Sequence, residues 1–218
     1  QKVGDFFASG MDVAAIEKAG TKPLEPWLAK VDALKSRGEL PKLLAELHAR
    51  RLGAGYGFFV MQDQKESTRY LPMLGQGGLG LPDRDYYLKD DAKSKEIREK
   101  YLAHVAKMLE LLGEAPEAAK AKAAVVMDLE TKLAKASRTR VELRDPERNY
   151  NKTSVAALAS EAPGYDWKAY LAAAGVPGVT ELNVRQPEFA KAFAEMAAKE
   201  PLDSWKAYLR WHLVRATA

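Results

Sequence analysis

The feature that most constrains the fold of this chain is the spacing of apolar residues in two long, neighbouring segments. In residues 91–112 and again in residues 117–137, apolar side chains recur every three or four positions. This spacing matches the 3.6 residues of a helical turn, so each segment predicts an amphipathic helix that buries one face. The positions are Ile97, Tyr101, Val105, Met108 and Leu112 in the first segment, and Val126, Leu129, Leu133 and Ala136 in the second.

Shorter helices are predicted on both sides of this pair from capping residues and helix breakers. They cover about residues 12–20, 23–37, 39–52, 154–161, 167–174, 187–199 and 203–218. The last helix has Trp205, Leu209 and Leu213 near one side, and an uncovered apolar side predicts a partner surface there. Aromatic residues of the later helices have the spacing of core residues, with a stacking platform for bases or sugars as the alternative. These are Trp167, Tyr170, Trp205, Tyr208 and Trp211.

The pattern changes after the first three of these helices. Tyr56–Met61 is an aromatic and β-branched run, Asp63–Ser67 is turn-like, and Thr68–Leu74 is a second extended candidate. Together they predict a β-hairpin at about residues 56–74. The fold class is therefore predicted to be mainly α, a multi-helical lobe with one small β-hairpin. A sheet of four or more strands is not expected.

Composition excludes several classes of function. The chain lacks cysteine, which excludes disulfides, thiol catalysis and cysteine-ligated zinc. Its net charge of +4 comes from 34 basic and 30 acidic residues that are interspersed, so no nucleic-acid partner is predicted. Apolar runs are far shorter than the roughly 20 residues of a membrane span, so none is predicted in this chain. The densest basic stretch, Arg138–Arg148, also contains acidic residues and predicts a local salt-bridge network.

The residues that could carry chemistry are isolated from one another in the sequence. His48, His104 and His212 lie in predicted amphipathic helices, and none has a second histidine four residues away, as a helical zinc pair requires. They are interpreted as polar or half-buried helix residues, and an enzyme built on His104 or His212 would lack partners at workable spacing. Gly75–Gly80 fits the spacing Gly-x-Gly-x-x-Gly but lacks the βαβ context of a dinucleotide site, so it is interpreted as a flexible or tightly turned loop.

Three segments carry recognisable motifs in one colinear order. Leu79–Tyr87 reads Leu-Gly-Leu-Pro-Asp-Arg-Asp-Tyr-Tyr, Arg144–Lys152 contains Arg-Asp-Pro and Tyr-Asn-Lys, and Trp205–Trp211 belongs to the helix that follows. They resemble segments of the neprilysin and endothelin-converting-enzyme family of zinc metallopeptidases, which has one further residue between the Arg and the Asp of the second motif. The matching residues that form this structural motif are Gly80, Pro82, Arg84, Asp85, Tyr86, Arg144, Asp145, Tyr150 and Asn151.

The resemblance implies that residues 1–218 form a single helical region, an incomplete N-terminal portion of a larger two-lobed peptidase. The family's catalytic His-Glu-x-x-His helix and its partner residues are absent from this sequence. No catalytic and no metal-ligating residue is therefore assigned. The full-length protein is expected to be a zinc metalloendopeptidase whose cofactor zinc is held by a downstream catalytic lobe. This chain alone is expected to be inactive and to build a chamber that admits only oligopeptides.

The motif residues are expected to be structural, with buried Arg–Asp pairs joining segments at Arg84–Asp85 and Arg144–Asp145. The alternative function is a stand-alone helical module that binds a peptide or protein without enzymatic activity, and it requires a gene that ends near Ala218. Because the chain starts with Gln1 and its last helix has no Gly or Pro stop, both ends are interpreted as cuts. The composition indicates a bacterial protein, with a periplasmic or secreted location favoured over a cytoplasmic one.

Overall fold

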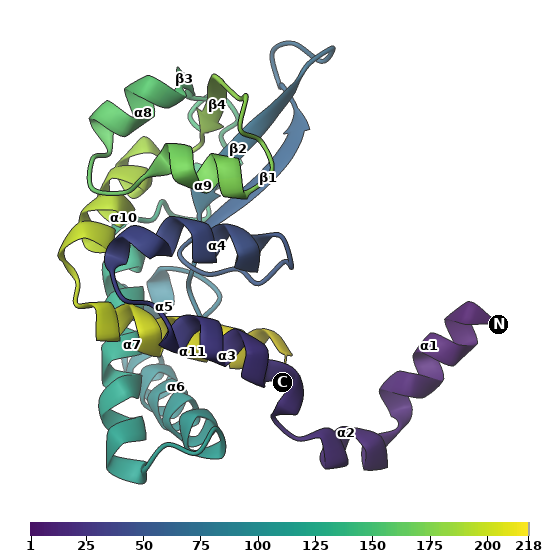
Figure 1. Cartoon of the computed structure of the whole chain (residues 1–218). Helices are drawn as coiled ribbons and strands as arrows, with labels where there is room; N and C mark the ends of the chain where they lie inside the picture. Colours follow the sequence, from purple (N-terminus) through teal and green to yellow (C-terminus); the bar gives the residue numbers. More distant parts are fainter. Residues whose placement is uncertain (218) are drawn as a thin grey trace.

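The computed structural model describes residues 1–217 and is mainly α-helical, as the apolar spacing predicts (Figure 1). The two long helices are an adjacent pair that runs down one end of the molecule. The helices are α1 Lys2–Met11, α2 Val13–Ala19, α3 Glu25–Asp32, α4 Leu40–His48, α5 Asp85–Leu88, α6 Ala92–Leu111, α7 Pro116–Ala136, α8 Val155–Glu161, α9 Trp167–Ala173, α10 Pro187–Lys199 and α11 Leu202–Thr217. The strands are β1 Tyr56–Gln62, β2 Tyr70–Gln76, β3 Lys152–Ser154 and β4 Glu181–Val184.

The predicted hairpin is present, but it does not stand alone. Strands β1 and β2 pair antiparallel, as expected for residues 56–74, and β4 and β3 extend them into a four-stranded sheet of order β1-β2-β4-β3. Strand β4 runs parallel to β2, with Met73 opposite Asn183, and antiparallel to β3. The expectation of fewer than four strands was therefore wrong. Strands of three and four residues are too short to display a sequence period of two.

Helix α11 is buried within the body of the fold. It packs against α7 and α3, and its apolar residues Trp205, Leu209 and Leu213 are at most 1% exposed. The expectation that this side would be left uncovered for a partner is therefore wrong. The residues that cover it come from helices distant in sequence, which a local pattern does not reveal.

An aromatic cluster forms the centre of the main core. Tyr56 of β1 lies in edge-to-face contact with Tyr170 and Phe193, whose ring centroids are 5.1 and 4.8 Å away. Trp167 is also buried in this cluster. His48 borders it: Nδ1 lies 2.7 Å from Oη of Tyr170, and Nε2 lies 2.8 Å from the carbonyl oxygen of Ala54. The aromatic residues are therefore core residues, which leaves no stacking platform for bases or sugars among them.

The position of His48 predicts a pH-dependent stability. Burial lowers the pKa of His48 from its ordinary value of 6.5, so the unfolded chain takes up a proton that the folded chain does not. Stability from this group is therefore lost as the pH falls below that value, by up to about 1 kcal/mol between pH 7 and pH 5.5. Urea unfolding at the two pH values is expected to show this loss in the native chain and not in His48→Gln. The change His104→Gln, at an exposed helix position, is the control and should keep the full loss.

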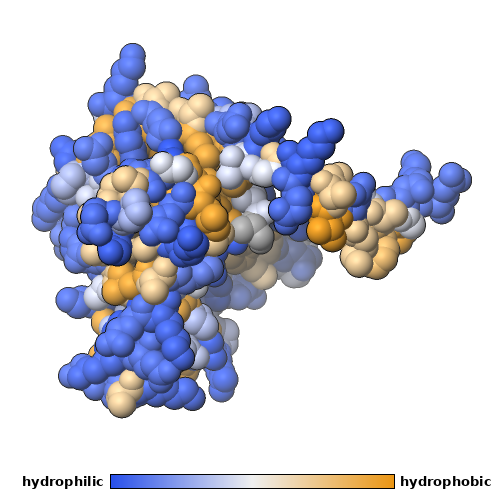
Figure 2. Space-filling model, turned by 90° about the horizontal axis from the view of Figure 1, so that it is seen from below, coloured by the Kyte–Doolittle hydropathy of each residue, from blue (hydrophilic) through white to orange (hydrophobic). Residues whose placement is uncertain are grey.

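Helices α1 and α2 form an arm that projects from the body (Figure 1). Its apolar side chains lie in water: Val3 is 83% exposed, Phe6 80% and Phe7 68%. Figure 2 shows hydrophobic residues along the projecting arm. An exposed apolar stripe of this kind is typical of a surface that interacts with another protein or with a membrane. Within residues 1–217, no helix combines the length and the hydropathy that crossing a membrane requires.

Candidate functional site

The first motif loop is anchored on a buried glutamate. Glu130 of α7 is 0% exposed, and its carboxylate accepts hydrogen bonds of 2.8 Å from both Tyr87 and Tyr101. Nε2 of His212 lies 3.0 Å from the same carboxylate. The hydroxyl of Tyr87 in turn accepts a bond of 2.8 Å from the backbone N–H of Leu81. One carboxylate thus joins α5, α6, α7 and α11 beneath the loop.

The two tyrosines remain hydrogen-bond donors over the whole physiological pH range. Burial, followed by the negative charge of Glu130, raises the pKa of Tyr87 and of Tyr101 well above the ordinary value of 10. A neutral hydroxyl that donates to a carboxylate is the stable arrangement in such a site. Trp211 adds a further bond, from its Nε1 to Oη of Tyr101 at 2.8 Å.

Two glycines of the motif loop are required by close packing. A Cβ atom at Gly80 would overlap the Tyr101 hydroxyl and lie 2.6 Å from Cζ of that ring. Gly78 has a φ of +74° and would place a Cβ 2.7 Å from the backbone of Gly55. Tyr208 bridges the two backbones, since its hydroxyl accepts from Gly55 N–H at 2.8 Å and donates to the carbonyl of Gly78 at 2.7 Å. The interpretation of this stretch as a tight turn agrees with these contacts.

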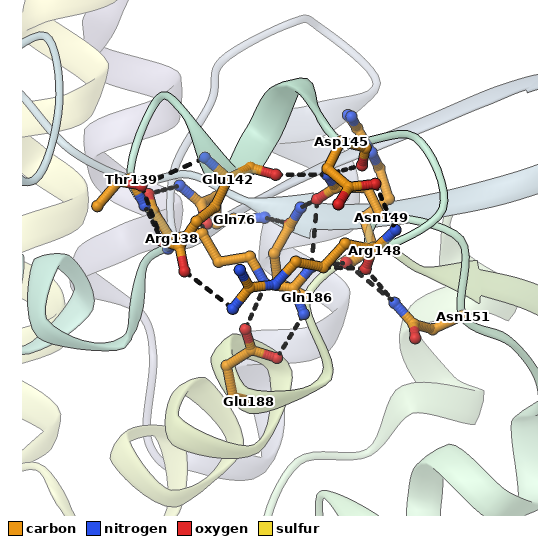
Figure 3. A network of polar contacts seen from close by, with 11 residues as sticks. Gln76, Arg138, Thr139, Glu142, Asp145, Arg148, Asn149, Asn151, Gln186 and Glu188 are labelled. Atoms are coloured by element: carbon orange, nitrogen blue, oxygen red, sulfur yellow. Dashed lines mark hydrogen bonds and ion pairs between the residues drawn. The ribbon is translucent and has the colours of Figure 1, made fainter.

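The second motif lies in a polar junction that is centred on Arg138 (Figure 3). The Arg138 side chain is only 10% exposed, and its guanidinium donates to both carboxylate oxygens of Glu188, at 2.5 and 3.0 Å. It also donates to the backbone carbonyls of Arg148 at 2.7 Å and Arg185 at 3.2 Å. One side chain therefore ties the end of α7 to the 138–151 loop and to the start of α10.

Amide side chains complete the junction (Figure 3). Gln76, at the end of β2, exchanges two hydrogen bonds with the backbone of Arg138, at 2.7 and 3.0 Å. Gln186 accepts from the backbone N–H of Gln76 at 2.8 Å and donates to Asn149 at 2.6 Å. Asn183 of β4 is 1% exposed and accepts from the backbone N–H of Asn151 at 2.7 Å. Buried amides with both ends satisfied fix one arrangement of these segments.

The expected Arg–Asp pairs are not formed. Asp85 pairs with Lys89 at 3.0 Å, and the Asp145 carboxylate accepts from the backbone N–H of Arg148 at 3.1 Å. Among the residues that the structure describes, no carboxylate lies within 4.0 Å of a guanidinium nitrogen of Arg84 or Arg144. Each Asp serves instead as a local partner in its own helix or turn. The predicted salt-bridge network in this stretch is represented by Arg148 with Glu142, at 2.9 Å.

The remaining motif residues contact neighbouring segments or line a cavity. Tyr150 donates to the buried carboxylate of Asp63 at 2.8 Å, which joins the loop to the hairpin. Asn151 donates to the backbone carbonyls of Arg148 and Arg185, at 3.0 and 3.2 Å. Pro82 lines a cavity of about 360 Å³ between the first motif loop and residues 137–143, whose other lining residues include Arg84, Arg138, Arg140 and Arg215. Tyr86 lies in α5, and its backbone carbonyl accepts from Arg98 at 2.9 Å.

Sequence reasoning missed Glu130, the hub of the first network, and placed Arg138 in a predicted salt-bridge stretch without identifying it as the hub of the second. Neither lies in a motif, and their partners are 29 to 82 and 10 to 62 positions away. The geometry does not resemble a metal site: within residues 1–217, no group of three or more His, Cys, Asp or Glu side chains could hold a metal ion. What the arrangement provides is a rigid set of loops around the cavity.

Known proteins share both the sequence and the fold of this chain. A family model described as peptidase family M13 matches residues 1–218. The chain is 28% identical over 231 residues to endothelin-converting enzyme 1 of Cavia porcellus, a match that covers 100% of this chain and 30% of that protein. An endothelin-converting enzyme homolog of Locusta migratoria is 29% identical over 174 residues, which are 76% of this chain and 24% of that protein.

Solved structures give the same result. The crystal structure of Mycobacterium tuberculosis zinc metalloprotease Zmp1 with an inhibitor superposes with a TM-score of 0.90 and 37% identity, over 97% of this chain and 32% of that chain. PepO from Lactobacillus rhamnosis shares the fold, with a TM-score of 0.70 at 16% identity. This chain therefore spans about a third or less of the length of the proteins it resembles.

Proposed function

The chain belongs to peptidase family M13, and from this we propose that it is the non-catalytic, chamber-forming helical part of a zinc-dependent metalloendopeptidase that cleaves oligopeptides. The observation that carries the proposal is the family match over the whole chain, combined with a span of only 30% of the relative's length. The catalytic chemistry belongs to the remaining polypeptide in this proposal.

The placement of the zinc outside this chain is supported by the donor set. A catalytic zinc needs three protein ligands and one open position for water. The described residues contain no group of three or more candidate ligands within reach of one ion. A ring nitrogen of His48 lies instead within hydrogen-bond distance of Tyr170 inside the fold, and one of His212 within the same reach of Glu130. We therefore propose that the metal-bound water is generated on the downstream catalytic lobe.

The exposed apolar residues of the arm support the proposal that the arm is in permanent contact with the downstream catalytic lobe. The arm's apolar residues are 52–83% exposed, whereas the apolar faces of α6, α7 and α11 are buried. Leaving such a stripe in water is unfavourable by roughly 25 cal/mol for each Å². We propose that the downstream lobe covers Val3, Phe6 and Phe7, and that the body of the chain then faces the substrate. A rigid body held by the Glu130 and Arg138 networks suits a chamber wall that excludes folded proteins.

Peptide cleavage with and without a chelator tests this proposal. Cleavage of a short peptide is expected from the full-length protein only, because residues 1–218 lack the zinc ligands. A chelator is expected to abolish the cleavage, and added zinc to restore it. Cleavage by residues 1–218 alone that a chelator leaves unchanged would contradict the proposal and favour another class of function. We also propose a periplasmic or secreted location in a bacterium, which fractionation of the native host would check.

A further inference from the structure

We propose that the free edge of strand β1 binds an extended oligopeptide as an added β-strand. This inference rests on the proposed function, because it assigns to one surface of this chain the peptide that the full-length enzyme would cleave. It names a site on the chamber-forming part that recognises peptide backbone.

The register of the hairpin identifies the backbone groups at this edge. The backbone N–H of Asp63 donates to the carbonyl of Arg69 at 2.9 Å, just beyond the last pair of the β1–β2 ladder. Antiparallel partners alternate between hydrogen-bonded and non-hydrogen-bonded pairs, so the odd-numbered residues of β1 bond to β2. The N–H and C=O groups of the even-numbered residues therefore point to the other side. Apart from Tyr56, whose N–H donates to the carbonyl of Ala54, these are Phe58, Val60 and Gln62.

This edge is free and carries no protective residue. β1 is the first strand in the order β1-β2-β4-β3, so only β2 pairs with it among the described residues. Natural edge strands are usually protected by lysine, proline, inward-pointing charge or a bulge. Tyr56–Gln62 contains no proline and no charged residue, and it pairs in continuous register with β2. Protection is confined to the turn, where Arg69 pairs with Glu66 and Glu181.

The side chains along the edge suit a transient, partly apolar occupant. Phe58 packs against Tyr170, with ring centroids 5.1 Å apart, while Phe59, Val60 and Met61 are 41%, 50% and 39% exposed. Phe6 and Phe7 of the arm are 80% and 68% exposed, more than the apolar residues of the β1 edge. A permanent contact is therefore more strongly favoured for the arm than for the edge. In β-strand addition, main-chain hydrogen bonds to a free edge supply the affinity, and side chains beside the edge contact alternate side chains of the added strand.

The position of the hairpin agrees with a role in the chamber. In Figure 1 the hairpin and the arm both extend toward the right-hand side of the body. If the arm contacts the catalytic lobe, that lobe lies on the same side as the hairpin. An extended peptide held along β1 would then lie between the two parts of the enzyme. Backbone bonds to the edge do not depend on side chains, which suits a peptidase that accepts varied oligopeptides.

Val60→Pro in the full-length enzyme tests the proposal. Val60 lies opposite Pro72 in a non-hydrogen-bonded pair, so proline removes an outward N–H without removing a bond to β2. We expect KM for a ten-residue peptide rich in Val, Leu and Ser to rise about tenfold, and KM for a four-residue peptide to stay unchanged. Val60→Ala keeps the N–H and is the matched control, with a change of at most about threefold. An unchanged Tm in each variant verifies the fold.

A second measurement does not depend on turnover. Chelator-treated full-length protein is titrated with fluorescein-labelled ten-residue peptides that are N-methylated at one backbone position each. We expect weaker binding at every second position, by about threefold to tenfold, and no such alternation in Val60→Pro. If binding weakened at every second N-methylated position but the full-length protein showed no chelator-sensitive cleavage, the edge site would be supported and the proposed function would be wrong. Equal effects of Val60→Pro and Val60→Ala, or binding without alternation, would overturn the edge site even in an active enzyme.

Discussion

Glu130→Ala is expected to lower the free energy of unfolding by about 4 kcal/mol, because it leaves several buried polar groups without an acceptor. The hydroxyls of Tyr87 and Tyr101 donate to this carboxylate at 2.8 Å, and Nε2 of His212 lies 3.0 Å away. All four residues are at most 8% exposed, so water cannot replace the lost bonds without opening the fold. Urea unfolding followed by tryptophan fluorescence would measure the change, since Trp211 belongs to the same network.

The matched variant is Glu130→Gln. It keeps the volume and one acceptor oxygen, so the expected loss is about half as large. If Glu130→Ala unfolded within about 1 kcal/mol of the native protein, the network would have no central role in stability. The motif loop provides a local readout, because the N–H of Leu81 bonds to Tyr87. Hydrogen exchange at Leu81 is expected to accelerate in Glu130→Ala.

Arg138→Ala is expected to cost about 3–5 kcal/mol, the range for breaking a largely buried ion pair. The change removes two bonds to Glu188 and one bond to each of the carbonyls of Arg148 and Arg185, which then keep only the donor from Asn151. The half-exposed position of Glu188 places the result toward the lower end of that range, because its carboxylate can recover hydration. Thermal and urea unfolding of the purified protein would measure the loss.

Arg144→Ala is the control for this experiment. Arg144 lies in the same loop and in the family motif, but its side chain is exposed and has no carboxylate within 4.0 Å among the described residues. Its replacement is therefore expected to change stability by no more than about 0.5 kcal/mol. A larger loss for Arg144→Ala than for Arg138→Ala would show that the motif residue, and not the buried neighbour, holds the junction.

The sequence was a reliable guide where one apolar face decides the structure. Helices α6 and α7 lie within one residue of the predicted ranges, because their periodic residues face the core. The helix predicted to reach residue 37 ends at Asp32, and Leu34, two residues later, is buried in the core. Strands β3 and β4 were missed because a few residues carry no period. Their pairing depends on β2, which is distant in sequence.

The polar networks could not be predicted from the sequence for a different reason. A glutamate in a long helix is usually exposed, and nothing beside Glu130 indicates that it is buried. Its partners Tyr87, Tyr101 and His212 come from three other helices. The motif of the second loop indicated the correct segment, yet the decisive side chain was Arg138, six residues before Arg144. A motif therefore located the junction without identifying the residue that holds it.

The contact between α3 and α11 bears on how the protein folds during translation. Arg210 bonds to the Asp32 carboxylate at 2.8 and 2.9 Å, and the two residues are 178 positions apart. At about 5–20 residues per second, a ribosome needs roughly 10–35 seconds to make the intervening chain. During that interval Leu28 and Val31 have no α11 to bury them. The nascent chain would therefore expose them to chaperones until Leu213 emerges, and synthesis rate would set how long this vulnerable state lasts.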